Sequence, residues 1–305
     1  MNTRAYVEAR RHEIEAALPA FLSSPADCPP VLREAMAYSL LAGGKRLRPI
    51  LCLASCDAVG GNRAAVMPAA CAIEMIHTYS LIHDDLPAMD NDTMRRGRPT
   101  LHVVAGEGQA ILAGDALLTL AFELLAGDPR SASHELRTRT LDVIRVLSSA
   151  AGPIGMVGGQ AIDLACVTPD PQGRLAPALD AEGLRHMHAK KTGALIRASA
   201  VAGATLGGGS ETQVAAIDAA AAEFGLAFQI VDDVLDVEAT SAALGKTAGK
   251  DAAAGKPTYP SLYGLDASKR MAAQCLERAE AELHAADLTG SHLLGIGRWV
   301  VDRQN

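Results

Sequence analysis

Two aspartate-rich stretches constrain the fold of this chain more than any other feature of its sequence. LIHDDLPAMDNDTMRRG (81–97) and FQIVDDVLDV (228–237) each place an Asp-Asp pair directly after apolar residues, with a further Asp soon after. Carboxylates at the end of an apolar run are costly to desolvate unless something neutralises them. The six residues are Asp84, Asp85, Asp90, Asp232, Asp233 and Asp236. Two such groups indicate a shared cationic centre, and oxygen-only ligands favour Mg2+ over zinc.

The two groups need different backbones to present their carboxylates together. On a regular helix, Asp232 and Asp236 share one face. Asp84 and Asp90 are six positions apart, which would place them on nearly opposite sides of a continuous helix. Because Pro87 ends or distorts a helix, we expect Asp90 to return beside Asp84.

Two other interpretations of the acidic stretches are less favourable. A helix cap or solvated helix end would explain one Asp-rich stretch, but both stretches lie next to residues expected to be buried. An EF-hand loop starting at Asp90 would need Gly at its sixth position and Glu at its twelfth. Arg95 and Leu101 stand there instead. We therefore predict metal ligands in both stretches.

The rest of the chain predicts one all-α domain spanning residues 1–305. Alanine is abundant and aromatic residues make up 3%, which favours close-packed helices over sandwiches or barrels. Strand signals are nearly absent, and no composition shift or long flexible linker marks a domain boundary. The ranges expected to be helical are 1–22, 31–42, 49–58, 67–86, 110–125, 133–150, a helix from 159, 181–206, 211–237 and 267–286.

Charge and cysteine content restrict partners and location. The net charge of −7 argues against nucleic acid as a general partner. The six cysteines show no CxxC pair, so we expect reduced, buried thiols and a cytoplasmic location. No stretch approaches the roughly 20 uninterrupted apolar residues of a membrane span, and the N-terminus lacks the apolar segment of a secretory signal. We therefore expect no membrane span.

Basic residues beside glycines or acidic residues predict a phosphate-bearing ligand. They are Lys45, Arg48, Arg95, Arg96, Lys191, Lys246 and Lys256. Each one alone is more often a solvated surface charge. Together with acidic metal groups they fit phosphate or diphosphate oxygens, which Arg binds bidentately and Lys contacts as a point charge.

Other functional motifs are not supported. GKT at 245–247 lacks the Walker A glycine five positions earlier, where Thr240 stands, and no strand precedes it. The glycines at 158–159 lack the βαβ context of a dinucleotide site, and no Ser/His/Asp or Cys/His pattern stands out. Gln160 and Asp163, at i, i+3 on an otherwise apolar helix, fit a core hydrogen bond and a functional site equally well.

Short segments follow one another in a diagnostic order between about Val31 and Leu265. They are GGKRLRP, HTYSLIHDDLPAMD, RRGRPTLH, GDALLTLAFELL, GGQAIDL, KTGALI, GLAFQIVDDVLDV, LGK and GKPTYPSLYGL. Together they resemble the bacterial short-chain trans-prenyltransferases, the farnesyl diphosphate synthases. The resemblance implies a helical bundle around a deep central cavity, a homodimer, and Mg2+-dependent condensation of isopentenyl diphosphate with dimethylallyl and geranyl diphosphate to farnesyl diphosphate (C15).

The resemblance also implies a role for each matching residue. Those expected to hold three Mg2+ ions are Asp84, Asp90 and Asp232, assisted by Asp85, Asp233 and Asp236. Those expected to contact the allylic diphosphate are Arg95, Lys191 and Lys256. Those expected to contact isopentenyl diphosphate are Lys45, Arg48, His77 and Arg96. Those expected to face the developing allylic cation are Thr192 and Gln229, and Lys246 is expected to close the site.

Product length is expected to depend on Tyr79, five residues before Asp84, with Ser80 beside it. The Pro87-Ala88 pair resembles the two-residue insertion of the bacterial farnesyl type, where an aromatic ring stops the growing chain near fifteen carbons. Ordinary core packing is the other interpretation of Tyr79. Asn91 departs from the family pattern, in which another Asp often stands.

Three alternatives remain open. A geranylgeranyl or geranyl diphosphate synthase would use the same mechanism. A class I terpene cyclase is less favoured, because it normally carries one DDxxD motif with a different second motif and aromatic residues that stabilise cations. A non-catalytic paralogue is expected to lack a metal ligand, and none is missing from the sequence.

Overall fold

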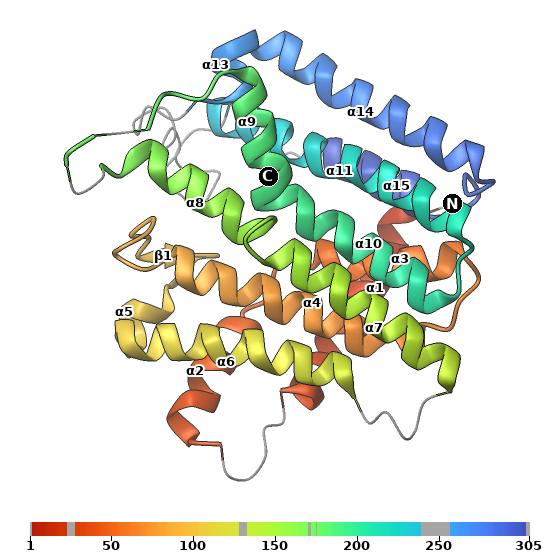
Figure 1. Ribbon diagram of the computed structural model, residues 1–305, viewed down its shortest axis with the longest axis horizontal. Helices are drawn as coiled ribbons and strands as arrows, with labels where there is room; N and C mark the ends of the chain where they lie inside the picture. Colours follow the sequence, from red (N-terminus) through yellow and green to blue (C-terminus); the bar gives the residue numbers. More distant parts are fainter. Residues whose placement is uncertain are drawn as a thin grey trace. The chain divides into compact units, whose positions relative to one another are not determined.

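The computed structural model describes residues 2–22, 28–127, 133–169, 172–174, 176–238 and 257–302, and these residues are almost entirely helical (Figure 1). The helices are α1 (Thr3–Phe21), α2 (Pro30–Leu40), α3 (Leu47–Ala58), α4 (Arg63–Asp84), α5 (Leu101–Ala105), α6 (Glu107–Ala126), α7 (His134–Ala151), α8 (Met156–Val167), α9 (Ala181–His188), the π-helix η1 (Ala189–Gly193), α10 (Ala194–Gly207), α11 (Glu211–Glu238), α13 (Tyr259–Tyr263), α14 (Leu265–Ala285) and α15 (Leu293–Val301). The strands in these ranges are β1 (Met94–Arg95) and β2 (Arg98–Pro99), an antiparallel pair. The all-α prediction is confirmed.

Long helices lie close to their expected positions, and the short ones were missed. The sequence did not predict α5, α13 or α15 because five to nine residues give too few turns for a hydrophobic period. The helix expected over 181–206 is interrupted by η1, which the period did not indicate. Lys246 and Lys256 lie outside the described residues.

The chain groups into two compact units. One contains Asn2–Arg145 and Ala202–Gly209, and the other contains Val146–Val201 and Ser210–Asn305. The expectation of a single domain stays a prediction, and each unit is described by itself.

In the N-terminal unit, α4 is the central helix. Every residue from 69 to 76 is buried, as expected for a helix surrounded by others. Figure 1 shows α6 lying beside α4, and the two pack along their lengths. A Cβ at Gly114 of α6 would lie 2.1 Å from Nε2 of His83, so glycine is required for this close approach.

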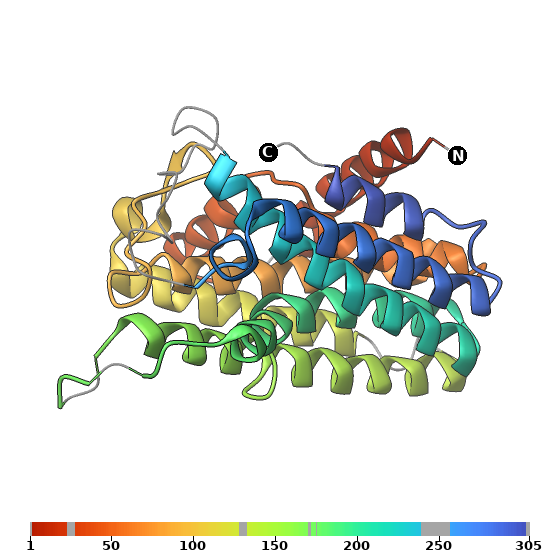
Figure 2. The same ribbon diagram turned by 90° about the horizontal axis from the view of Figure 1, so that it is seen from above.

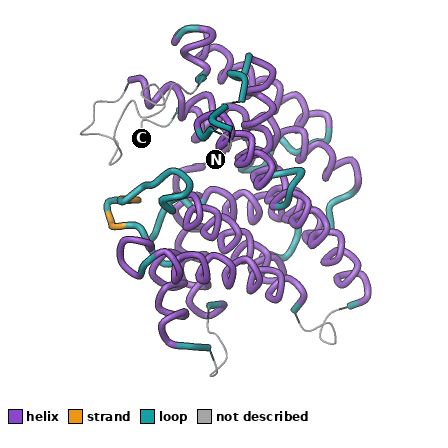
Figure 3. Tube along the Cα trace, turned by 60° about the vertical axis from the view of Figure 1, so that its left-hand side comes forward, coloured by secondary structure: helices purple, strands orange, loops and turns teal. Residues whose placement is uncertain are grey.

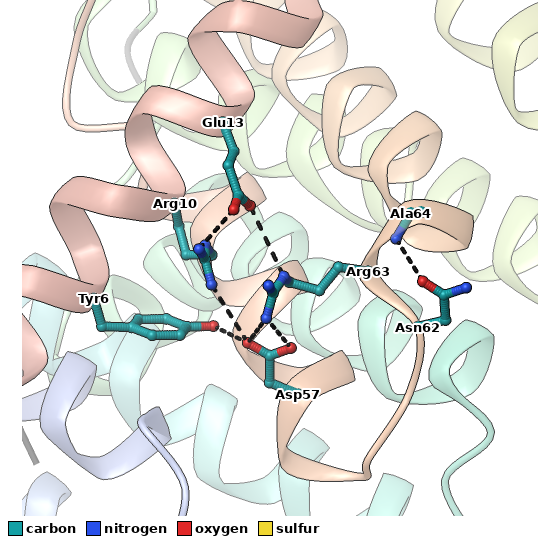
Figure 4. Close-up of polar contacts among 7 residues, drawn as sticks. All are labelled: Tyr6, Arg10, Glu13, Asp57, Asn62, Arg63 and Ala64. Atoms are coloured by element: carbon teal, nitrogen blue, oxygen red, sulfur yellow. Dashed lines mark hydrogen bonds and ion pairs between the residues drawn. The ribbon is translucent and has the colours of Figure 1, made fainter.

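A polar network attaches α1 to this unit (Figure 4). The Tyr6 hydroxyl donates to Asp57 at 2.6 Å, and Arg63 donates to both oxygens of the same carboxylate at 2.9 and 3.1 Å. Arg10 lies 3.9 Å from Asp57 and 2.6 Å from Glu13. Burial and the Asp57 contact raise the pKa of Tyr6. The network joins α1 to the end of α3 and the start of α4.

In the C-terminal unit, α11 packs against α14 and α15 (Figure 2). A Cβ at Gly297 of α15 would lie 2.3 Å from the Phe224 ring of α11, so this contact also needs glycine. The apolar residues Ala227, Ile230 and Val231 of α11 belong to the same buried cluster as Cys275 of α14.

Within the described residues, four helical stretches are long and apolar enough to cross a membrane by length and composition alone. They are Arg63–Asp84, Glu107–Ala126, His134–Val167 and Glu211–Glu238, and 67%, 33%, 28% and 50% of their apolar windows are buried within the protein. This differs from the sequence expectation, which required uninterrupted apolar runs, whereas these windows include isolated charged residues. The expected absence of a membrane span therefore stays a prediction.

Candidate functional site

The first acidic stretch forms a compact turn at the end of α4. The helix ends at Asp84, before Pro87, and the Asp90 amide then donates to the Asp84 carbonyl at 2.9 Å. The Asn91 amide donates to the Leu86 carbonyl at 3.1 Å, and Asn91 adopts a φ of 52°, a left-handed conformation that asparagine tolerates. The predicted return of Asp90 to Asp84 is confirmed at the level of the backbone.

Asp85 forms an ion pair with Arg95. Nε of Arg95 donates to the two carboxylate oxygens at 2.8 and 2.9 Å, and Nη2 lies 2.6 Å from Oδ1. Arg95 ends β1, and the hairpin turn that follows has positive φ angles at Arg96 and Gly97 (52° and 73°), as a type I′ turn requires. Figure 3 shows this hairpin in orange. Asp85 therefore holds the hairpin against the end of α4.

The GGKRLRP loop is anchored by Arg46, which the sequence analysis did not select. Arg46 is 3% exposed, and its guanidinium donates to Glu74 at 2.6 Å and to the Leu40 carbonyl at 2.8 Å. It has a φ of 51°. A buried, paired Arg46 holds the loop that carries Lys45 and Arg48. Glu74, an acidic residue within an apolar run of α4, was the feature of the sequence that could have predicted a buried basic partner.

The residues expected to bind the second diphosphate lie in this loop, as Lys45 and Arg48 do, or beside it, as His77 and Arg96 do. Nη1 of Arg48 lies 3.2 Å from Nε2 of His77. Arg96 donates to the Gly43 carbonyl, and a Cβ at Gly44 would lie 2.6 Å from Cζ of Arg96. Burial, followed by the charges of nearby arginines, lowers the pKa of His77 well below its ordinary value. His77 is therefore neutral and accepts a hydrogen bond from Arg48.

The second acidic stretch lies on the regular helix α11 and shows the same division of roles as the first. Asp232 and Asp236 are partly exposed, and Gln229 precedes Asp232 by one turn on the same side. Asp233 is 6% exposed and accepts a hydrogen bond from the Tyr259 amide at 2.9 Å. In both Asp-Asp pairs, the second carboxylate is buried and holds a neighbouring segment. The first is partly exposed.

The π-helix η1 contains Lys191 and Thr192, and π-helical turns occur often at functional sites. Nζ of Lys191 lies 2.5 Å from Oδ2 of the buried Asp163 in α8. A Cβ at Gly159 would lie 2.2 Å from the Lys191 backbone nitrogen. A Cβ at Gly225 of α11 would lie 3.1 Å from Cα of Gly193 in η1. These glycines let η1 pack against α8 and α11.

The sequence left the role of Asp163 undecided, and the structure pairs its buried carboxylate with Lys191. Among the described residues, Oε1 of Gln160 has no hydrogen-bond partner. The position of Asp163, one turn after Gly159 on an apolar helix, was the only sign in the sequence that it has a specific partner. That partner, Lys191, lies 28 positions away.

The Tyr79 ring is buried in the N-terminal unit, with 6% exposure. It packs edge-on against the His83 ring, with 5.7 Å between centroids, and Nε2 of His83 lies 3.1 Å from the Ile111 carbonyl of α6. Burial and the charge of Asp84 raise the pKa of Tyr79 to about 12. The Ser80 hydroxyl donates to the His77 carbonyl at 2.8 Å. The chain-length roles of Tyr79 and Ser80 stay predictions.

The carboxylate pairs fit Mg2+ only together with a phosphate-bearing ligand. Within the described ranges, no group of three or more His, Cys, Asp or Glu side chains converges as a metal site. Mg2+ is usually bound by one or two carboxylates, with water and substrate phosphates completing its octahedral shell. Asp84 with Asp90, and Asp232 with Asp236, are donor sets of that kind.

The chain matches the family model described as polyprenyl synthetase over residues 29–288. The dimethylallyltranstransferase of Fischerella ambigua is 46% identical over 302 residues, covering 99% of this chain and 84% of that protein. The large subunit 1 of a heterodimeric chloroplastic geranylgeranyl pyrophosphate synthase from Arabidopsis thaliana is 48% identical over 275 residues, covering 90% of this chain and 72% of that protein. An apo crystal structure of an FPP/GFPP synthase from Zymomonas mobilis aligns with a TM-score of 0.84 and 36% identity, covering 98% of this chain and 99% of that one.

Proposed function

Because the chain belongs to the polyprenyl synthetase family, we propose that it uses Mg2+ to condense isopentenyl diphosphate with dimethylallyl and geranyl diphosphate into farnesyl diphosphate. Its prenyltransferase chemistry follows from the family. The metal, the substrates and the product length are the proposal. The observation that supports it best is the hydrogen bond from the Asp90 amide to the Asp84 carbonyl, which brings the backbones of these two aspartates together.

The allylic diphosphate leaves its carbon only when the growing negative charge is neutralised. Asp84, Asp90, Asp232 and Asp236 would hold Mg2+, which when bound supplies that neutralisation. Lys191 would contact the same diphosphate, and its ion pair with Asp163 keeps its ammonium group in a defined place. Arg95 would contact this diphosphate as well, and its ion pair with Asp85 would hold it in position.

The second diphosphate would bind at the GGKRLRP loop. Arg48 and Arg96 lie beside His77 and the loop glycines, and the neutral imidazole orients Arg48 without adding charge. Holding isopentenyl diphosphate there would place its alkene next to the allylic carbon, which removes most of the entropic cost of the reaction. Thr192 and Gln229 would face the allylic cation.

The reaction needs no side chain as a base. The allylic carbon–oxygen bond breaks with its electrons on diphosphate, and the alkene carbon forms the new carbon–carbon bond. A proton then leaves the condensed product, and the released diphosphate accepts it. An apolar surrounding keeps water from the cation.

Product length separates the main proposal from its rival. A geranylgeranyl diphosphate synthase is the second candidate, because a relative that is 48% identical has that name. Chain-length analysis should give C15 from the wild type and longer products from Tyr79→Ala, because removing the ring removes a buried obstacle. Tyr79→Phe keeps the ring and should still give C15. C15 from Tyr79→Ala would refute the role of the ring, and C20 from the wild type would favour the rival.

Substrate omission tests the remaining alternatives. The chain should turn over only with isopentenyl diphosphate, an allylic diphosphate and Mg2+, and EDTA should abolish the reaction. Hydrocarbon from farnesyl diphosphate alone would identify a terpene cyclase. No turnover by the folded chain with all components would identify a non-catalytic paralogue.

A further inference from the structure

A pocket in the C-terminal unit lies between α9, α11, α13 and α14, and has a volume of about 440 Å3. Small-molecule sites usually enclose roughly 300–1,000 Å3, so the pocket is large enough for one. None of the residues assigned above to Mg2+ or to either diphosphate lines it. Its apolar wall includes Leu226, Ile230 and Met271.

Tyr259 lines this pocket and has an unsatisfied hydroxyl. The residue is 2% exposed, and among the described residues its hydroxyl has no hydrogen-bond partner. Buried hydroxyls are nearly always hydrogen-bonded. The ring is held firmly, with Tyr263 stacked at 6.3 Å and His188 at 5.7 Å between centroids. The Tyr259 hydroxyl therefore has no partner among the described residues, and a ligand in the pocket would supply one.

Arg185 provides a charge at the same pocket. It is exposed on α9, and within the described part of the chain its guanidinium forms no hydrogen bond or ion pair. The other arginine of the lining, Arg278, donates to Glu223 at 2.7 Å. Burial and Asp233 raise the pKa of Tyr259, whereas the charge of Arg185 lowers it. Arg185 and Tyr259 both line this pocket.

We propose that this pocket binds a small amphipathic anion. Its phosphate or carboxylate head would be held by the Arg185 guanidinium and the Tyr259 hydroxyl, and its apolar body would lie against Leu226, Ile230 and Met271. Arginine binds either head group bidentately, and a neighbouring hydroxyl donor completes the coordination of an anionic oxygen.

Tyr259 also connects the pocket to the segments that carry the proposed chemistry. Its backbone amide donates to Asp233, which directly follows Asp232. Its ring packs against His188, the residue before η1 and Lys191. A ligand at Tyr259 would therefore stabilise α11 and η1 in one arrangement. This coupling rests on the proposed function, but binding at the pocket does not.

Calorimetric titration of the whole chain with octyl phosphate and with octanoate tests the binding. The solution contains EDTA and no substrate, so the result does not depend on the prenyltransferase reaction. We expect binding by at least one anion, none by octanol, and an affinity about tenfold weaker in Arg185→Gln and in Tyr259→Phe. Arg270→Gln, which removes an exposed arginine of α14 outside the lining, should bind as the wild type does.

The two anions distinguish a phosphate head from a carboxylate head, and binding of either one supports the site. Failure of both to bind, or binding that neither pocket variant weakens, would overturn the proposal. Tyr259→Phe keeps the packed ring, and Arg185→Gln changes a surface residue, so both variants should fold.

Hydrogen exchange of the 257–263 segment tests the coupling. Saturating octyl phosphate, or octanoate if only that binds, should slow exchange of this segment by about threefold or more in the wild type, because the Tyr259 amide donates to Asp233. Binding without slower exchange would refute the coupling and leave the ligand site intact. Loss of prenyltransferase activity in other variants would bear on neither result.

Discussion

At the scale of single residues, the two Asp-Asp pairs divide between a proposed metal ligand and a residue that holds the fold together. Asp85 and Asp233 are 4% and 6% exposed, and each holds a neighbouring segment. Asp85 pairs with Arg95 of the hairpin, and Asp233 accepts the amide of the first residue of α13. Substitutions of adjacent aspartates should therefore have different consequences.

Asp233→Ala should lower the free energy of unfolding by about 1–3 kcal/mol, because the buried Tyr259 amide loses its acceptor. Asp232→Ala should change stability little and lower kcat/KM by roughly a hundredfold or more, because it removes a proposed ligand of the metal that stabilises departing charge. Urea denaturation and steady-state kinetics of the two variants provide the comparison. Equal losses of stability would contradict the division of roles.

His77 predicts a pH dependence of stability. Its folded-state pKa lies below the unfolded value near 6.5, so the unfolded chain takes up the proton first as the pH falls. His77 therefore costs no stability above about pH 6.5. Below it, stability falls by up to about 1.4 kcal/mol per pH unit.

His77→Gln keeps an acceptor for Arg48 but cannot be protonated. The difference in unfolding free energy between wild type and this variant should be constant from pH 7 to 8 and shift in favour of the variant at pH 5.5. A difference that stays constant down to pH 5.5 would show that His77 titrates normally in the folded chain.

At the scale of elements, glycines set the position of η1 in the C-terminal unit. Gly159 faces the Lys191 backbone, and Gly225 faces Gly193. The ion pair of Lys191 with Asp163 then defines the direction of the ammonium group. A methyl group at Gly159 would overlap the Lys191 backbone, whereas one at Gly225 would need only a small shift.

Gly159→Ala should lower the unfolding free energy by about 1–3 kcal/mol through overpacking and reduce kcat on the order of a hundredfold through misplacement of Lys191. Gly108→Ala in α6 is the matched control, because a Cβ there meets nothing within 4 Å. It should be neutral or stabilise by up to about 1 kcal/mol. Thermal unfolding and turnover of both variants test this prediction. A Gly159→Ala enzyme with normal kcat would refute the role of Gly159 in positioning Lys191.

At the scale of the whole molecule, exposed apolar residues on α5 and α6 favour self-association. Val103, Val104, Ile111 and Leu112 are 52%, 54%, 44% and 52% exposed. Because contiguous exposed apolar patches typically mark interaction sites, we predict that these side chains form the interface of the homodimer expected from the family resemblance.

Sedimentation of the wild type should therefore show a dimer, and Leu112→Glu should weaken dimerisation at least about tenfold because the charge would be desolvated. Val31→Glu is the control: it adds the same charge to a residue that is 53% exposed in the first turn of α2, where an acidic side chain is tolerated. A monomeric wild type, or a Leu112→Glu variant that dimerises normally, would exclude this surface.

The sequence by itself determined the features that depend on local chemistry. Helical periods predicted the long helices, and Pro87 predicted the turn that returns Asp90 to Asp84. The order of the motifs predicted the family. The helices and the turn follow from residues within a few turns of one another, because backbone propensity acts over that distance, and the family follows from the order of short local motifs along the chain.

Only the tertiary structure decided which partner each polar side chain has. The pairs Arg46–Glu74, Lys191–Asp163 and Asp233–Tyr259 join residues 28, 28 and 26 positions apart. Helix propensity contains no information about such pairs, because packing of the helices brings them together. The buried second aspartates, the π-helix and a Tyr259 hydroxyl without a partner among the described residues are consequences of that packing.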